Sequence, residues 1–235
     1  ETSPVADKPF VAGGTITFDC GTTSVAIPLT SPKTITTAIV LNGGGAITLS
    51  GQNAVTPFTV LSGGSLTLQA LTVADGVTSG DGGCLLNLGG TLTLMDVNVE
   101  HCMASMSGGG ICNGSGTLAL HAVTVTDTHA GSNGGGVFNL QSLTMDGVST
   151  ISDCSAVRGG GLSNGAGTAT LAGTWIHGNQ AATGGGVANV ATLVMNGVTL
   201  SQNAADGAGG GLDNSGSATI TNCTFSANTA AVGGG

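Results

Sequence analysis

Three glycines, an apolar residue, any residue and an asparagine form a segment that recurs along this chain at nearly constant intervals. The full copies occupy residues 108–113, 134–139, 159–164, 184–189 and 209–214. A degenerate copy at 82–87 carries Cys84 in place of the third glycine, and residues 233–235 begin another copy. Successive copies begin 24 to 26 residues apart. A fixed period of this size is typical of a solenoid, in which each repeat stacks on the next.

Each repeat contains two runs in which apolar and polar residues alternate, and the glycine segment is a third. The first runs are residues 91–94, 117–120, 142–145, 168–171, 192–195 and 217–220. The second runs are residues 97–99, 123–125, 174–176, 198–200 and 223–225. Alternation with period two indicates strands. Three short strands per repeat, without a helical stretch, predict an all-β, right-handed parallel β-helix with 24–26 residues per coil.

The asparagines of the repeat are predicted to stack inside the coils. The asparagine that ends each glycine segment has inward parity, and its amide can bond to the amides above and below it. This first ladder comprises Asn87, Asn113, Asn139, Asn164, Asn189 and Asn214. A second corner column comprises Cys102, Thr128, Cys154, Asn179, Asn203 and Asn228.

The cysteines show neither a CxxC pair nor a zinc-binding spacing. The second corner column suggests that Cys102 and Cys154 are inert corner or core residues, two coils and roughly 10 Å apart, which is too far for a disulfide. Cys84 and Cys112 lie on neighbouring coils with outward parity but are offset by two residues. Cys223 occupies a valine position and is expected in the core. Cys20 has no evident partner, so no pairing is assigned.

The regular repeats cover residues 82–235, and residues 11–81 are expected to form irregular coils of the same solenoid. Residues 1–10, with Pro4 and Pro9, are expected to form an extended lead or cap. Solenoid ends normally need a cap, because an open end exposes core residues and strand edges. The partial repeat at 233–235 suggests that the C-terminus is truncated or uncapped.

The charge composition excludes some classes of function. The net charge is −9, and the only basic residues besides histidine are Lys8, Lys33 and Arg158. Nucleic-acid binding needs a cationic surface, so it is not expected. No run of 18 apolar residues occurs, so no membrane-spanning helix is expected in this segment. The low lysine content and many Thr, Ser, Asn and Gly residues suggest an extracellular surface.

The glycine segment, the Thr-Leu-Thr-Leu runs and the later Phe-x-x-Asn motif together resemble a known group. Phe225 and Asn228 complete that motif, whereas 176–179 and 200–203 carry an aliphatic first residue. The chain is similar, over about residues 13–235, to bacterial right-handed parallel β-helix surface proteins with polymorphic outer-membrane-protein-type repeats. The earlier coils depart from the pattern at the asparagine. The resemblance implies secretion or surface display, and it implies no single activity.

One column of titratable residues is the best candidate for chemistry: it consists of Asp75, His101, Asp127 and Asp153. Parallel β-helices include polysaccharide lyases and hydrolases, and neighbouring acids of the column are expected about 5 Å apart. The column is therefore a candidate cation site, for structural calcium, or an acid–base pair. The alternative is a solvated turn, which we favour. We assign no catalytic residue and expect no cofactor.

Two outward features are candidates for ligand contact. Trp175, the only tryptophan, lies at an outward position, where it can stack on a sugar ring, anchor a partner or cover an adjoining loop. The first outward Thr/Ser row, which is flat enough to suggest an ice-binding surface, comprises Thr91, Thr117, Ser142, Thr168, Thr192 and Ser217. A flanking row is interrupted by Ala119 and Val194.

These observations favour a non-enzymatic, extracellular structural or adhesive solenoid at the cell surface. Open strand edges can accept another solenoid, so head-to-tail self-association into a surface filament is expected as one form of assembly. Other surface components or a polysaccharide are the other expected partners. A carbohydrate-active β-helix is the first alternative, and an ice-binding protein is the second.

Overall fold

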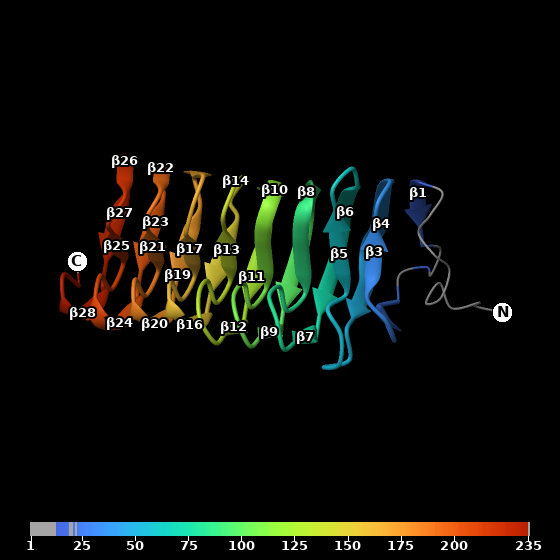
Figure 1. Cartoon of the computed structure of the whole chain (residues 1–235), viewed down its shortest axis with the longest axis horizontal. Coiled ribbons are helices and arrows are strands. Elements are labelled where there is room, and N and C mark those ends of the chain that lie inside the picture. The colour runs from blue at the N-terminus through green and yellow to red at the C-terminus, as the bar shows by residue number, and fades with distance from the viewer. Residues whose placement is uncertain (1–12, 19–20, 22, 235) are drawn as a thin grey trace.

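The computed structural model describes residues 13–18, 21 and 23–234. Its strands stack along one long axis, with the N-terminal coils at one end and the C-terminal coils at the other (Figure 1). Neighbouring coils pair in parallel, and the described residues contain no helix. The predicted all-β parallel β-helix is therefore confirmed. The lead predicted at residues 1–10 lies outside the described residues.

The coils form four faces, which we name A to D in chain order from the glycine segment; among the described residues no strand of face D precedes Val77. Face A consists of β3 (Lys33–Ile35), β5 (Phe58–Leu61), the first parts of β8 (Leu85–Glu100) and β10 (Ile111–His121), β13 (Val137–Asn139), β17 (Leu162–Asn164), β21 (Val187–Asn189) and β25 (Leu212–Asn214). Face B consists of β1 (Gly14–Thr17), parts of β4 (Ala38–Ser50), β6 (Ser65–Ala74), β8 and β10, then β14 (Ser142–Asp146), β18 (Thr168–Ala172), β22 (Thr192–Asn196) and β26 (Ser217–Thr221).

Faces C and D complete the coils. Face C consists of β2 (Val25–Pro28), the last parts of β4, β6 and β8, then β11 (Thr124–Thr126), β15 (Thr150–Ser152), β19 (Trp175–His177), β23 (Thr199–Ser201) and β27 (Thr224–Ser226). Face D consists of β7 (Val77–Thr78), β9 (Met103–Ala104), β12 (His129–Ala130), β16 (Ser155–Arg158), β20 (Gln180–Thr183), β24 (Ala204–Ala208) and β28 (Thr229–Val232).

Faces A, B and C correspond to the three strands predicted for each repeat, and face D adds a fourth. The face D segments are rich in alanine and lack strong alternation, as in Gln180–Thr183, where only Ala181 turns inward and is buried. The pairing of face D comes from stacking on the neighbouring coil rather than from a pattern within the segment. This explains why the alternation alone did not reveal it.

Each of the three glycine positions of the repeat favours glycine for a different structural reason. The first, such as Gly134 with φ of 63°, adopts a left-handed backbone that favours glycine. At the second, Gly135, a Cβ would lie 2.3 Å from the Gly160 carbonyl oxygen of the next coil. At the third, Gly136, an added Cβ would lie 3.4 Å from the sulfur of Cys154, which is in the same coil. The motif therefore allows a sharp turn, a close approach between coils and a close approach across a coil.

The core is a single continuous cluster along the axis, built from inward residues of successive coils. In face B, for example, Leu92, Leu118, Leu143 and Leu193 are at most 1% exposed. Their in-register stacking buries apolar area in every coil, which stabilises the fold by roughly 25 cal/mol per Å². No helix in the described part of the chain is long and apolar enough to cross a membrane.

Candidate functional site

The first predicted asparagine ladder is present along face A. Each amide nitrogen donates to the amide oxygen of the next coil, at 2.8 Å from Asn87 to Asn113, from Asn113 to Asn139, from Asn139 to Asn164 and from Asn164 to Asn189, and at 2.7 Å from Asn189 to Asn214. The first five are fully buried, while Asn214 in the last coil is exposed. The amides also bond main-chain atoms, as in the bond from Asn164 Nδ2 to the Thr192 carbonyl.

The second predicted ladder stands at the corner between faces C and D. Asn179 donates to Asn203 at 2.9 Å, and Asn203 donates to Asn228 at 3.0 Å. The amide oxygen of Asn179 also accepts the backbone N–H of Cys154, so the ladder continues into the preceding coil without an asparagine there. Both ladders therefore act structurally, because their donors and acceptors are used within the solenoid.

Cys102 is a buried corner residue, as predicted, but its disulfide partner was not predicted. Cys102 forms a disulfide with Cys84, with a Cα–Cα distance of 5.6 Å, and Cys84, for which outward parity was predicted, is buried in the core. The cysteine pairs that the repeat places near one another, Cys102 with Cys154 and Cys84 with Cys112, lie on different coils, whereas this bridge joins two corners of one coil, 18 residues apart in the sequence. The sequence feature that indicates this bridge is the replacement of the third glycine by Cys84. The third glycine of the repeat lies against the corner column in every coil.

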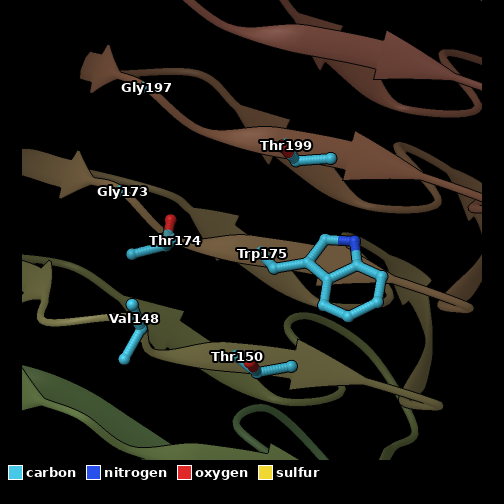
Figure 2. Close-up of a pocket in the computed structure, with 7 residues that line it drawn as sticks. All are labelled: Val148, Thr150, Gly173, Thr174, Trp175, Gly197 and Thr199. Carbon is cyan, nitrogen blue, oxygen red and sulfur yellow. The ribbon is translucent and has the colours of Figure 1, made fainter.

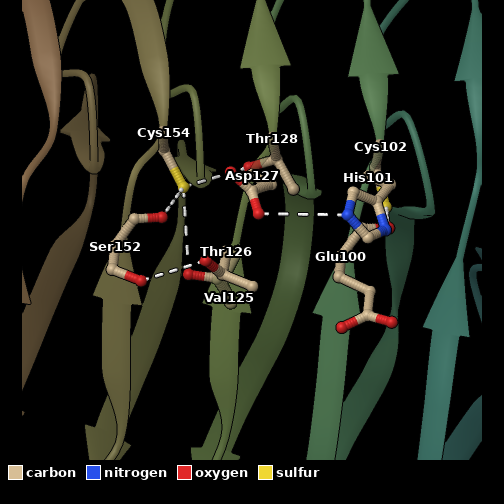
Figure 3. Close-up of polar contacts among 9 residues, drawn as sticks. All are labelled: Glu100, His101, Cys102, Val125, Thr126, Asp127, Thr128, Ser152 and Cys154. Atoms are coloured by element: carbon tan, nitrogen blue, oxygen red, sulfur yellow. Dashed lines mark hydrogen bonds and ion pairs between the residues drawn. The ribbon is translucent and has the colours of Figure 1, made fainter.

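Two further cysteines are buried free thiols. Burial, together with the Asp81 carboxylate, raises the pKa of Cys112 to about 12; burial raises the pKa of Cys154 to about 11. Thr128 donates to the Cys154 sulfur at 3.2 Å (Figure 3). Cys154 is thus a buried corner residue, as predicted, and Cys112 is also buried, although its position in the strand alternates with the inward Ile111 and Asn113. Cys223 is partly buried against the core.

The candidate metal column lies at the turn between faces C and D. Asp75, His101, Asp127 and Asp153 all adopt left-handed backbone, with φ between 51° and 55°. Figure 3 shows His101 directed toward Asp127; the His101 Nε2–Asp127 Oδ2 distance is 3.9 Å, and both side chains are 59% exposed. Among the described residues, no three His, Cys, Asp or Glu side chains form a group that could hold a metal ion.

This turn explains the residue types of the column without a ligand. The next coils place Gly178, Gln202 and Ala227 at the equivalent turn, also with positive φ. Aspartate, asparagine and glycine tolerate this backbone better than other residues, so a left-handed corner selects them. The column is therefore a recurring turn position.

Two other ion pairs lie on the flanks. His121 Nδ1 and Asp146 Oδ1 are 2.6 Å apart at paired positions of neighbouring coils on face B. Arg158 reaches Asp213 two coils further on, with an Nη2–Oδ2 distance of 3.7 Å. Each is a single pair on the surface, where such pairs contribute little stability.

Trp175 lies on the outside of face C and forms one side of a hollow. Its indole Nε1 donates to Ser201 Oγ at 2.8 Å. The ring of His177 stacks against it, with centroids 3.9 Å apart and planes at 33°. The side chain remains 46% exposed. Two contacts therefore fix the orientation of the indole while much of the ring faces solvent.

The hollow beside Trp175 has a volume of about 340 Å³. It is lined by Val148, Thr150, Gly173, Thr174, Trp175, Gly197 and Thr199. Figure 2 shows the indole ring face-on between Thr150 and Thr199, with Val148 and the two glycines at the opposite end. A Cβ on Gly173 would meet no atom within 4 Å. The hollow thus exists partly because two consecutive coils lack side chains there.

Trp175 was predicted from the sequence as a contact residue, whereas the rest of this hollow was not predicted. Thr174 occupies an inward column where Val123 and Val198 stand in other coils, and its buried hydroxyl has no hydrogen-bond partner among the described residues. Val148, with φ of 61°, projects into solvent and is 83% exposed. Two sequence features indicate the hollow. One is a threonine in a column that carries valine in other coils, and the other is a histidine two residues after the tryptophan.

The Thr/Ser rows are aligned as the repeat predicted. Thr91, Thr117, Ser142, Thr168, Thr192 and Ser217 stand in one register column on face B. Face C carries a second outward column, which the sequence analysis did not identify. It comprises Thr48, Thr72, Asn98, Thr124, Thr150, Trp175, Thr199 and Thr224. The column begins with Ala26, which pairs with Thr48, so Trp175 replaces one of its otherwise small residues.

Comparison of the chain with protein-family models, curated proteins and solved structures finds no match. The evidence on function therefore comes from the geometry of the solenoid itself.

Proposed function

We propose that this chain is a non-enzymatic structural and adhesive solenoid that acts outside the cell or at its surface. The observation that carries the proposal is the continuous buried ladder from Asn87 to Asn189, which ties successive coils in one register. Breaking any buried link leaves unpaired polar groups, at about 1–3 kcal/mol each. A rod held in this way suits the display of a long surface.

The Cys84–Cys102 disulfide supports an extracellular location, since disulfides persist mainly in oxidising compartments. The low charge content and the similarity of the repeats to those of bacterial surface proteins of the polymorphic outer-membrane-protein type point the same way. A bacterial source is part of this proposal.

The distribution of titratable groups supports a non-enzymatic role. His101 with Asp127, and His121 with Asp146, are isolated pairs at different corners, with side chains 59% and 40% exposed. Catalytic acids and bases usually lie in sites that exclude water and shift their pKa values. These exposed pairs instead resemble surface ion pairs.

A carbohydrate-cleavage screen tests the non-enzymatic part of the proposal. The full chain is incubated with acidic and neutral polysaccharides, and the formation of reducing ends is measured. We expect no cleavage. Cleavage that Asp127→Ala abolishes would replace the proposal with the carbohydrate-active alternative.

Electron microscopy of the purified chain tests assembly. Head-to-tail association into filaments predicts particles whose lengths are multiples of a single rod. A uniform population of single rods would contradict it. Ice binding is tested separately by thermal hysteresis, and we expect none because Ala119 and Val194 interrupt the row that flanks the Thr/Ser column of face B.

A further inference from the structure

We propose that the hollow beside Trp175 is a binding site for a pyranose ring of a neutral oligosaccharide. The ring would stack on the exposed face of the indole, and its hydroxyl groups would meet Thr150 and Thr199. This inference deepens the adhesive part of the proposed function by naming a ligand class, and it rests on that function only for its biological setting.

The indole is prepared for stacking before a ligand arrives. The Nε1–Ser201 hydrogen bond of 2.8 Å and the His177 ring, with its centroid 3.9 Å away, hold Trp175 in one orientation. A fixed ring loses little conformational entropy on binding, which favours affinity. Because 46% of the side chain is exposed, the apolar C–H face of a sugar can cover surface that is otherwise wet.

The surroundings of the indole match a neutral polyol. None of the seven residues that line the hollow is charged. Thr150 and Thr199 flank the ring in the same outward column, and neither side-chain hydroxyl has a hydrogen-bond partner among the described residues. Hydroxyl groups beside an aromatic face provide the mixed apolar and polar surface that a pyranose presents in return.

Thr174 contributes little surface to the hollow, because its side chain belongs to an inward column. Its side chain is 2% exposed and lines the hollow, and its Oγ1 has no hydrogen-bond partner among the described residues. A buried hydroxyl without a partner costs free energy, so valine would be expected here as in Val123 and Val198. Because Oγ1 has almost no accessible surface, a ligand in the hollow would meet Trp175, Thr150 and Thr199 rather than this hydroxyl.

The size of the hollow and the charge of the chain fit a small neutral ligand. A hollow of about 340 Å³ lies within the roughly 300–1,000 Å³ typical of small-ligand sites. Nucleotide bases also stack on tryptophan, but a chain with net charge −9 repels their phosphates. A neutral sugar does not meet this obstacle.

The single tryptophan makes the test direct, since intrinsic emission reports this site alone. The full chain is titrated with cellohexaose, xylohexaose and maltohexaose at micromolar to millimolar concentration, with an oligogalacturonate as the anionic comparison. We expect at least one neutral oligosaccharide to shift the emission saturably and to protect Trp175 from acrylamide quenching. The oligogalacturonate is expected to bind more weakly.

Two variants separate binding from folding, with calorimetry as the measurement. Trp175→Thr restores the residue found in Thr150 and Thr199, so the chain should fold normally and lose at least about tenfold in affinity. Val148→Gly removes a wall of the hollow and relieves the positive φ, so it should weaken binding while raising stability. Met95→Ala, an exposed site on face B, is the control and should bind as the native chain does.

The proposal is overturned if none of the three neutral oligosaccharides changes the emission at millimolar concentration. It is also overturned if Trp175→Thr binds as tightly as the native chain. Neither result would affect the carbohydrate-cleavage or electron-microscopy tests, so the structural role of the solenoid would still stand or fall on its own measurements.

Discussion

Cys84 takes the position of the third glycine in its coil, and Cys102 takes the corner position that faces it. In every later coil, a glycine and a corner residue stand at these two positions. An added Cβ on the third glycine would lie 3.1 Å from Asn179 Nδ2 at Gly161, and 2.9 Å from Asn203 Nδ2 at Gly186. The disulfide therefore takes the place of a packing contact already built into the repeat. This relationship leads to two predictions.

Reduction of the Cys84–Cys102 bridge should destabilise the chain by about 3 kcal/mol, the effect expected for a loop of this length. Cys84→Gly/Cys102→Thr copies the pair Gly110 and Thr128 of the next coil, so this variant should fold and be insensitive to reductant. Denaturant unfolding with and without reductant measures both effects. Equal stability of the native chain in the two conditions would contradict the assigned bridge.

A second bridge should form when Gly136 is replaced by cysteine, because the added Cβ would lie 3.4 Å from the sulfur of Cys154. The side chain of Ile151 approaches to 2.6 Å, so Gly136→Cys/Ile151→Val, which copies the Val99 beside Cys84, should oxidise more completely. Thiol labelling of the denatured chain counts the bridges. Gly136→Ala is the matched control, and it should only lower stability.

The ladder can be tested at one internal rung. Asn164→Ala removes the 2.8 Å bonds to Asn139 and Asn189, and each buried partner left without a bond costs about 1–3 kcal/mol. Asn214→Ala removes an exposed rung and should cost much less. The free energies of unfolding of the two variants test whether a buried rung contributes more stability than an exposed rung. Similar small losses at both sites would show that the buried ladder contributes little.

Thr174→Val should stabilise the chain by about 1 kcal/mol, because it removes a buried hydroxyl without a partner and restores the valine of its column. Ser149→Val in the preceding coil is the comparison. Ser149 Oγ accepts the Val123 N–H and donates to the Asp146 carbonyl, so that variant should be destabilised. The melting temperatures should move in opposite directions.

Alkaline pH should weaken the fold through the two buried thiols. The pKa of Cys112 is raised to about 12 and that of Cys154 to about 11, from 9.0 for an ordinary thiol. The folded chain therefore holds these protons longer than the unfolded chain does. The contribution of the two protonated thiols to the free energy of unfolding is fully present below pH 9. This contribution falls as pH rises through the folded pKa values.

The chain contains no tyrosine, so that side chain does not titrate in this window. Cys112→Ala/Cys154→Thr, with residues taken from the same columns, should show a flatter pH profile between about pH 9 and pH 12. An unchanged slope would contradict the burial of these thiols.

The period and alternation of the sequence predicted the coil, the inward columns and both asparagine ladders, because these features repeat and reinforce one another. Face D was missed, since Gln180–Thr183 pairs through its neighbours and not through a pattern of its own. The disulfide and the hollow were missed for a related reason. Cys84, Val148 and Thr174 are departures from the repeat, and their meaning depends on which residue lies across the coil.

Distances between spin labels on the outward column of face B test the central claim most directly, because residues of this column stand one coil apart in register. Labels at Thr91 and Thr168, Thr91 and Thr192, and Thr91 and Ser217 span three, four and five coils. At about 4.8 Å per coil, the in-register parallel solenoid predicts separations near 14, 19 and 24 Å. Distances that fail to rise in equal steps along this series would contradict the account.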